Sequence, residues 1–288
     1  MPRSCLVCDS DRIAFRFEKA GYKVMRCRSC RFEFVDLDAP ADFPYTMYTS
    51  DYFVDGHDKF GYADYVADKG NHMKYNQKKV YFIEKHLKGG MLLDVGCAAG
   101  FFLEALGPGW SCYGCDPSEA MVEVARARFG DHVAMAAFED YETDRVFDVI
   151  TMWDSIEHAV DPRKFLDKAY SLLKDNGLLF IGTMDSISPA PLILGKHWYY
   201  YVPPSHLWYF NRFNIAIFLK KSGFVQEKLV YYGKYVSVAE MLLNVAYMVG
   251  SKRLAQMAKK ISQESRWNLS VPYKVCDDMI VMARKRPR

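Results

Sequence analysis

The order of strand-like and helix-like segments beyond residue 72 constrains the fold of this chain most. Short apolar runs alternate there with segments of helical spacing. The apolar runs are 91–95, 110–116, 132–137, 147–153 and 177–183, and the helical segments include 73–87, 118–129 and 162–173. Such alternation predicts a parallel sheet with helices on both faces. Because sheets of this kind bind ligands at the carboxyl ends of their strands, the turns that follow the strands are the places to search.

The turn after the first strand, LDVGCAAG (93–100), consists mainly of small residues. Gly96 and Gly100 allow the backbone to approach a ligand closely. Asp116 ends the next strand, 22 residues after Asp94, where a carboxylate can accept hydrogen bonds from both hydroxyls of a ribose. We therefore expect a nucleoside-containing cofactor. A nicotinamide fingerprint would require glycine at 96, 98 and 101, where this chain has Gly, Ala and Phe.

This turn resembles the first motif of the class I S-adenosylmethionine-dependent methyltransferases. In that family an acid, an apolar residue and G-x-G-x-G follow the first strand; this chain matches at Asp94, Gly96 and Gly100 and has Ala98 at the middle glycine. FDVITMWDSIEHAVDP (147–162) is similar to the family's fourth strand and the turn after it. The resemblance implies an α/β, Rossmann-like doubly wound sheet whose last strand is antiparallel. A generic α/β domain without this cofactor is the alternative.

The resemblance also implies roles at the carboxyl edge of the sheet. Asp116 would hold the ribose and Gly96 the amino-acid portion of S-adenosylmethionine. Phe138 and Glu139 would lie beside the adenine, with a place in the core as the alternative for Phe138. Trp153 would lie near the methyl group or else cap the sheet. The implied cofactor-binding residues are Asp94, Gly96, Cys97, Gly100, Asp116, Phe138, Glu139 and Trp153, with Cys97 as a small packing residue of the turn.

A proton must leave an oxygen acceptor during methyl transfer, either to a general base or with the help of a metal ion. His158 and His206 are the candidate bases. DSIEH (154–158) is similar to the E-x-x-E-H segment of the ubiquinone-biosynthesis O-methyltransferases, whose acids and histidine can hold a divalent ion. The resemblance thus leaves two alternatives: a divalent ion at Asp154, Glu157 and His158, or a His158 that is structural or orients the substrate.

An insertion at 184–212 follows the fifth strand. Its residues 186–212 contain four prolines, two tryptophans, four tyrosines and two histidines, which are poor helix material but provide flat amphipathic contact surface. We expect this segment to form the wall on the acceptor side. Its P-P-x-H segment resembles one in bacterial small-molecule methyltransferases whose histidine points into the pocket, which makes His206 the preferred base. A helix cap or a satisfied buried histidine is the alternative for His206, and His197 is a weaker candidate.

Four cysteines near the start of the chain have the spacing of a zinc ribbon. The metal ligands predicted from the two C-x-x-C pairs, which 18 residues separate, are Cys5, Cys8, Cys27 and Cys30. A segment of 35 residues has too small a core to fold by itself, so we expect the metal to stabilise it. Because the protein would fill all four coordination positions, the zinc would be structural. Cys112 and Cys115 have the same spacing but lie in a predicted strand, where their side chains point to opposite faces, and we assign them no metal.

The domains expected from these patterns are a zinc ribbon (1–35), an acidic, tyrosine-rich linker or lid (36–71) and a methyltransferase domain (72–288). The chain lacks the apolar segment of a secretory signal at its start, so we expect a soluble, cytoplasmic protein. Residues 236–261 combine helical apolar spacing with lysine and arginine; packing on the sheet or on a dimer partner is the favoured explanation, and contact with an anionic membrane the alternative. The oligomeric state stays open.

These features favour O-methylation of a small molecule, such as a secondary metabolite, a sugar or a lipid-linked intermediate. A ribbon followed by a tyrosine-rich linker resembles bacterial small-molecule and sugar methyltransferases. The alternatives are N- or C-methylation, a non-catalytic role, and an RNA methyltransferase that uses the ribbon to bind RNA. The basic ends of the chain favour RNA, but the acidic linker and a net charge of only +3 make nucleic acid an unlikely partner.

Overall fold

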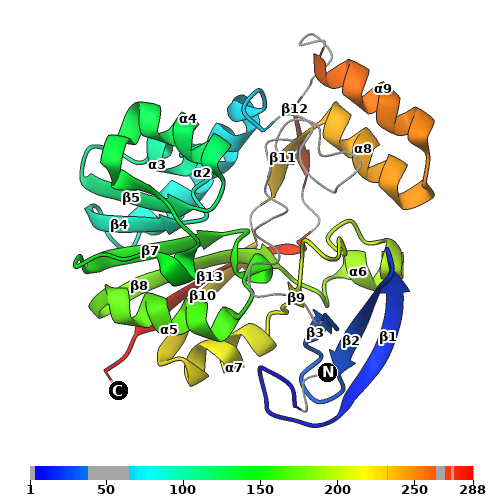
Figure 1. Ribbon diagram of the computed structural model, residues 1–288, viewed down its shortest axis with the longest axis horizontal. Helices are drawn as coiled ribbons and strands as arrows, with labels where there is room; N and C mark the ends of the chain where they lie inside the picture. Colours follow the sequence, from blue (N-terminus) through cyan, green and yellow to red (C-terminus); the bar gives the residue numbers. More distant parts are fainter. Residues whose placement is uncertain (1–3, 38–64, 232, 264–269, 274–275, 288) are drawn as a thin grey trace.

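The computed structural model describes residues 4–37, 65–231, 233–263, 270–273 and 276–287. Its largest element is a seven-stranded sheet in the order β10-β13-β8-β7-β4-β5-β6, covered by helices on both faces (Figure 1). The strands are β4 (Gly90–Val95), β5 (Trp110–Asp116), β6 (Val133–Met135), β7 (Phe147–Trp153), β8 (Leu173–Met184), β10 (Phe224–Tyr231) and β13 (Asp278–Lys285). The doubly wound α/β fold that the sequence predicts is confirmed.

Strand directions in the sheet also agree with the prediction. Strands β4 to β8 pair in parallel. Strand β13 lies between β8 and β10 and is antiparallel to both. The carboxyl ends of β4, β5, β7 and β8 therefore lie along one edge, beside the amino end of β13.

Two hydrophobic cores fill the two faces of the sheet, because successive side chains of a strand point in opposite directions. Leu92 packs with α2, α3 and α4, whereas its neighbour Leu93 packs with α5 and α7. The bounds of these helices are α2 (Lys69–Glu84), α3 (Phe101–Ala105), α4 (Glu119–Phe129), α5 (Pro162–Leu172) and α7 (Asn214–Lys221). The arrangement leaves the carboxyl edge of the sheet to the turns and to the inserted segment.

Helix α5 follows the loop that carries Glu157 and His158, and its first turn is capped by a side chain. The Asp161 carboxylate accepts hydrogen bonds from the backbone N–H groups of Arg163 and Lys164, and Pro162 is the first residue of α5. Such a cap contributes about 1 kcal/mol to stability. It fixes the point at which the chain leaves the turn after β7.

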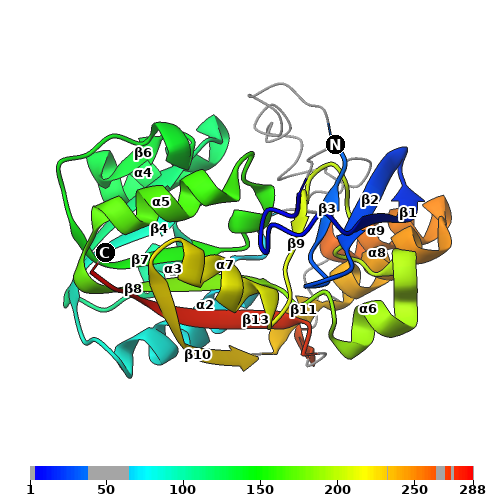
Figure 2. The same cartoon turned by 90° about the horizontal axis from the view of Figure 1, so that it is seen from below.

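A second, four-stranded sheet has the order β1-β2-β3-β9. Its strands are β1 (Ile13–Lys19), β2 (Tyr22–Cys27), β3 (Glu33–Val35) and β9 (Trp208–Tyr209). Figure 2 shows β9, which belongs to the inserted segment 184–212, beside the amino-terminal strand β3. The rest of the insertion contains the short α-helix α6 (Pro189–Leu194) and, directly after it, the 3-10 helix η6 (Gly195–His197). The cysteine-bearing segment (residues 4–35) and the inserted segment thus share one sheet.

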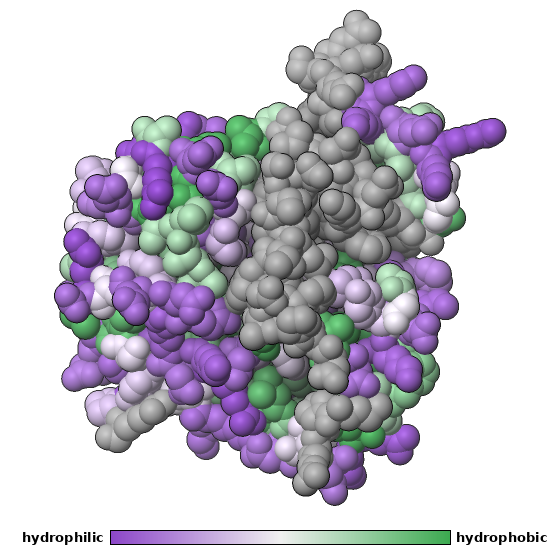
Figure 3. Space-filling model, viewed as in Figure 1, coloured by the Kyte–Doolittle hydropathy of each residue, from purple (hydrophilic) through white to green (hydrophobic). Residues whose placement is uncertain are grey.

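The third unit consists of the antiparallel pair β11 (Lys234–Ser237) and β12 (Ser270–Tyr273) with two helices between them. The stretch at 236–261 forms α8 (Val238–Val249) and α9 (Lys252–Gln263), separated at Gly250, whose φ is +66°. Hydrophilic side chains project from the region of α9 in Figure 3, and Lys252, Arg253 and Lys260 are exposed there. Among the described residues, no helix is both long enough and apolar enough to span a bilayer.

Candidate functional site

The turn after β4 has the backbone conformation that its glycines permit. Gly96 and Gly100 have φ values of +73° and +74°. A Cβ atom on Gly96 would lie 3.0 Å from the Cβ of Ser155, and one on Gly100 would lie 2.9 Å from the ring of Phe129. A side chain at position 100 would therefore clash with α4. This packing requires glycine there in addition to the close approach of a ligand that the sequence suggested.

Asp116 ties this turn to the end of β5. Its Oδ2 accepts a hydrogen bond from the backbone N–H of Ala98 at 2.8 Å, and its Oδ1 accepts one from the N–H of Ser118 at 2.9 Å. Burial raises the pKa of Asp116 to about 6, against the lowering effect of these two N–H groups. The carboxylate is therefore largely ionised at neutral pH, the form that accepts hydrogen bonds from a ribose.

A buried lysine, which the sequence did not indicate, lies beside the turn after β4 (93–100), called the cofactor turn below. Lys79 on α2 is only 5% exposed, and its ammonium lies 4.5 Å from the ring centroid of Tyr75 and 4.6 Å from that of Trp153. Burial raises the pKa of Asp94 to about 7, whereas a hydrogen bond from Thr151 (Oγ1 to Oδ1, 2.6 Å) and the charge of Lys79 lower it. A lysine in the middle of an ordinary helix carries no sequence signal of such a role.

Trp153 ends β7 at the same edge. Its ring packs edge-to-face on Phe102 with centroids 5.2 Å apart, and a Cβ on Gly182 would lie 2.8 Å from its ring. The indole is thus held between α3, β8 and Lys79. Trp153 is buried, at 8% exposed, and its contact with the methyl group stays a prediction.

Phe138 and Glu139 follow β6, as expected. Phe138 is buried and packs edge-to-face on Phe165 of α5, with ring centroids 5.3 Å apart. The backbone carbonyl of Glu139 accepts a hydrogen bond from Lys168. The structure therefore gives Phe138 the core position that the sequence left open, and contact of either residue with adenine stays a prediction.

Tyr65 covers the cofactor turn from the tyrosine-rich segment. Its ring stacks on Phe101 at 5.5 Å with an interplanar angle of 6°, and lies 4.3 Å from the ring of His72. Burial, together with the charges of Asp116 and Asp94, raises the pKa of its phenol. Tyr65 is the first described residue after a gap, and the remaining tyrosines expected in the linker, between 38 and 64, lie outside the described residues.

The two candidate bases lie together. The imidazole rings of His158 and His206 meet edge-to-face with centroids 4.6 Å apart. His158 Nδ1 lies 2.7 Å from the carbonyl oxygen of Ser205, and His206 Nδ1 lies 2.9 Å from that of Tyr200. Because a carbonyl oxygen only accepts hydrogen bonds, each Nδ1 carries a hydrogen, and in the neutral ring the lone pair is then on Nε2. Burial lowers the pKa of His158, so its ring is neutral at pH 7.

Ligand atoms of Glu157, His158 and His206 lie within 4.8 Å of one another. Glu157 is fully buried and accepts a hydrogen bond from Thr183 at 3.0 Å. Asp154, which the sequence analysis included as a metal ligand, is not a member of this group. The set that the structure brings together therefore has His206 in place of Asp154, because the inserted segment folds back over the turn after β7.

The four amino-terminal cysteines converge on one point. The Cys5 and Cys30 sulfurs are 3.6 Å apart, as are those of Cys8 and Cys27, and all four lie within 4.8 Å of one another. A tetrahedral zinc ion with Zn–S distances of about 2.3 Å places its sulfurs about 3.8 Å apart. The donor set and its spacing therefore fit a four-thiolate zinc site.

The backbone around the cysteines has matching turns. The N–H of Asp9 donates to the carbonyl of Cys5 and the N–H of Arg31 to that of Cys27, each at 2.9 Å. Both donor residues have left-handed backbone, with φ values of +57° and +60°. The hydrogen bond between Cys5 and Cys30 lowers the pKa of Cys5 and raises that of Cys30, so that one sulfur of the pair is the preferred thiolate. In the described part of the chain, Cys112 and Cys115 belong to no such group.

A family model described as a methyltransferase domain matches residues 68–229, more than half of the chain. A ubiquinone biosynthesis O-methyltransferase of Bradyrhizobium diazoefficiens is 28% identical over 183 residues, which are 57% of this chain and 71% of that protein. One of the same description from Coxiella burnetii is 30% identical over 119 residues, 38% of this chain and only about half (51%) of that protein.

Solved structures agree on the fold. The Burkholderia thailandensis 1,6-didemethyltoxoflavin-N1-methyltransferase, whose structure contains 1,6-didemethyltoxoflavin and S-adenosylhomocysteine, matches with a TM-score of 0.52 and 16% identity over 95% of this chain and 99% of that one. At this identity the likeness concerns the fold alone. The family match, the sheet order and the acids at the ends of β4 and β5 agree with one another: the chain belongs to the methyltransferase domain family and is a class I S-adenosylmethionine-dependent methyltransferase.

Proposed function

We propose that this enzyme methylates a hydroxyl group of a small molecule, with His206 or His158 as the base that takes the hydroxyl proton. The observation that carries the proposal is the facing pair of imidazoles, each with Nδ1 bound to a backbone carbonyl and its lone pair on Nε2. The pair lies after β7 and in the inserted segment. Relatives described as O-methyltransferases support oxygen as the acceptor atom.

Residues of this chain would hold the cofactor along the carboxyl edge of the sheet. In the proposal Asp116 binds the ribose hydroxyls, and the backbone at Gly96 and Cys97 borders the amino-acid portion. Asp94 is 2% exposed and lies in the field of Lys79, so the two provide one negative and one positive group for the charged ends of an amino acid. Phe138 and Glu139 would border the adenine and Trp153 the methyl group.

The bound cofactor supplies a methyl group on a positively charged sulfur. As the acceptor oxygen forms its bond to this carbon, the carbon–sulfur bond breaks and its electron pair stays on sulfur. The acceptor hydroxyl gives its proton to Nε2 of a histidine, which afterwards releases it to solvent. Much of the acceleration in such an in-line displacement comes from holding the reactants in position. The protein contributes the orientation of the acceptor and the base.

Neutral histidine is the required state of the base. Burial lowers the pKa of His158, which keeps its Nε2 unprotonated at neutral pH. His206 comes from the proposed acceptor wall and stacks with Tyr200 at a centroid distance of 6.0 Å. Because His206 lies in the proposed acceptor wall, we assign the proton transfer to His206 as the preferred base. His158 is the second candidate.

A divalent ion at Glu157, His158 and His206 is a second version of the same proposal. Two imidazole nitrogens and a carboxylate suit a transition metal, which would acidify a hydroxyl in place of a free base. The two versions differ in their response to chelation. A free base predicts full activity in a chelator that leaves the cysteine site loaded, whereas a catalytic ion predicts loss.

The four cysteines are proposed to hold one structural zinc ion. The thiolates would fill all four positions, so the ion itself would not contact substrate. The small sheet around it has little core of its own, and its support would come from the metal and from strand β9.

The experiment is a transfer assay with S-adenosylmethionine that carries a deuterated methyl group. Separate pools of phenols, sugars, amines and total RNA serve as acceptors, and mass spectrometry identifies the product and the methylated atom. We expect label on oxygen of a small molecule. Label on RNA, or only on nitrogen or carbon, contradicts the proposal. His197→Ala is the matched control for His206→Ala, because His197 lies exposed in the same segment.

A further inference from the structure

The residue after His206 is held from two sides. The carbonyl of Leu207 accepts a hydrogen bond from the N–H of Val35, in the small sheet, and its own N–H donates to the carbonyl of Glu157; both distances are 2.9 Å. Leu207 is thus bound on one side to the cysteine-bearing segment and on the other to the turn that carries His158. Leu207 lies between His206 and β9, and its partner Glu157 is the neighbour of His158. The distance between the two histidine rings therefore depends on where β9 lies.

Trp208 repeats this bridge with its side chain. Its ring stacks on Phe32 with centroids 6.0 Å apart and an interplanar angle of 8°. Its Nε1 donates a hydrogen bond of 2.6 Å to the carbonyl of Ala159, the residue after His158. Strand β9 also pairs with β3 through Phe34 opposite Trp208. One indole therefore joins the aromatic core of the cysteine-bearing segment to the histidine turn.

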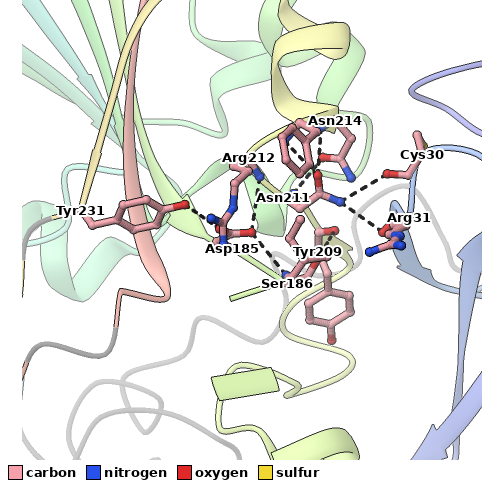
Figure 4. A network of polar contacts seen from close by, with 11 residues as sticks. Cys30, Arg31, Asp185, Ser186, Tyr209, Asn211, Arg212, Asn214 and Tyr231 are labelled. Carbon is pink, nitrogen blue, oxygen red and sulfur yellow. Dashed lines mark hydrogen bonds and ion pairs between the residues drawn. The ribbon is translucent and has the colours of Figure 1, made fainter. Parts of the chain in front are cut away.

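Asn211 forms hydrogen bonds with the backbone at the end of the second cysteine pair, Cys27 and Cys30. Its Nδ2 lies 3.3 Å from the carbonyl oxygens of both Cys30 and Arg31 (Figure 4). Its Oδ1 accepts hydrogen bonds from the N–H groups of Phe213 and Asn214, at 3.0 and 2.9 Å. Asn211 is fully buried, so these contacts are shielded from water.

The network continues from Asn211 to the large sheet. Arg212 forms an ion pair with Asp185 at 2.9 Å, and the hydroxyl of Tyr231 on β10 donates to the same carboxylate at 2.6 Å (Figure 4). Asp185 directly follows β8 and is fully buried. The cysteine pair, the inserted segment and the sheet edge are therefore joined by one continuous set of polar contacts.

We propose that Trp208 is a positioning residue, which sets the placement of the His158 and His206 rings and which is itself supported by the four-thiolate site. The proposal rests on the proposed function of the two histidines. Loss of the metal would loosen β3, and the loosening would pass through Leu207 and Trp208 to both imidazoles. The cofactor turn is also tied to β5 through Asp116 and would be much less affected. The ribbon would then serve the acceptor side of the active site and not act as a separate binding module.

The first test measures hydrogen–deuterium exchange in the full chain with S-adenosylhomocysteine bound. Metal is removed from the cysteines by dialysis against a chelator, without a thiol reagent, because Cys97 lies in the cofactor turn. We expect exchange to rise by about tenfold or more at Leu207 and in 156–159, with a much smaller change in 93–100. A rise confined to residues 4–35 would overturn the proposal, as would an equal rise throughout the chain.

The second test replaces Trp208→Phe, which keeps an aromatic ring on Phe32 but removes the donor to Ala159. Imidazole NMR signals are recorded at one pH, and S-adenosylhomocysteine affinity is measured by calorimetry. We expect the ring signals of His158 and His206 to shift, because the rings that now meet edge-to-face at 4.6 Å move relative to each other, with cofactor affinity and zinc content unchanged. Unchanged imidazole signals contradict the proposal, and so does an equal loss of cofactor affinity.

Phe15→Leu is the matched control, because Phe15 lies on β1 of the same small sheet and is 58% exposed. It should leave both readouts at the wild-type values, and a His158 shift as large as that of Trp208→Phe would overturn the assignment. Neither test uses an acceptor. They therefore keep their meaning if the histidines prove not to be the base, and failure of the two claims can be told apart.

Discussion

The ammonium group of Lys79 lies 4.6 Å from the ring centroid of Trp153, at the end of β7. A buried cation beside an indole and near Asp94 offers a partner for the carboxylate of an amino acid. We expect Lys79→Met to weaken S-adenosylmethionine binding by at least about tenfold, since a charge-assisted hydrogen bond is lost. Calorimetry measures the Kd. Lys74→Met, at an exposed position of the same helix, is the control and should bind as the wild type does.

Cofactor affinity should depend on pH through Asp94. Burial raises the pKa of this carboxyl to about 7, so it is protonated below that pH and ionised above it. S-adenosylmethionine carries positive charge on its sulfur and amino group, and the ionised form of Asp94 attracts it. We expect the Kd to fall as the pH rises from 6 to 8. In Asp94→Asn this dependence should be much weaker, and a flat wild-type profile would contradict the prediction.

The same carboxyl makes the cofactor-free protein less stable as the pH rises. The folded state holds the Asp94 proton up to about pH 7, whereas the unfolded chain releases it near its ordinary pKa of 3.8. Between these values the folded state binds more protons, so the free energy of unfolding falls with rising pH. Denaturant titrations of wild type and Asp94→Asn at pH 5 and 7.5 measure the difference, which should shrink in the variant.

Ala98 has left-handed backbone, with φ at +43°, at the position where the family motif has glycine. An L-residue with left-handed backbone costs about 1–2 kcal/mol of folding free energy. Glycine removes this cost, but its greater conformational freedom in the unfolded chain offsets part of the gain. Ala98→Gly should therefore raise the free energy of unfolding by about 0.5–1 kcal/mol. Thermal and denaturant unfolding measure it. Ala99→Gly, at the next buried position, should lower stability, and equal destabilisation by both variants would refute the strain at Ala98.

The cysteine site should contain one zinc ion per chain. Cys5→Ser removes a thiolate from the group of four and should lose the metal during dialysis against a mild chelator. Cys112→Ser, a change in β5, should keep it. Elemental analysis gives the zinc content of each variant. Retention of zinc by Cys5→Ser, or loss of zinc by Cys112→Ser, would be incompatible with the four-thiolate assignment.

The sequence predicts the large sheet well, because its strands are buried runs of apolar residues separated by turns. The bounds of β5 and β7 agree with the apolar runs at 110–116 and 147–153. The run at 132–137 forms only the three-residue strand β6. Burial fixes the existence of such elements, whereas their ends depend on neighbours that periodicity does not reveal.

The candidate site was harder to predict, because its parts meet only through tertiary contacts. A two-residue strand such as β9 has no periodicity, so the union of the inserted segment with β3 could not be read from the sequence. The same fold-back brings His206 to Glu157 and His158 and leaves Asp154 outside the group. Lys79 was missed for a related reason, since a lysine on a helix usually faces solvent.

The most direct test of the central claim is the single-turnover rate of methyl transfer at saturating S-adenosylmethionine, measured for the wild type and for the double variant His158→Ala/His206→Ala. The account predicts that the double variant binds the cofactor as tightly as the wild type and transfers methyl to the oxygen acceptor at least about 100-fold more slowly, since a general base contributes about that much. Transfer by the double variant at the wild-type rate would contradict it.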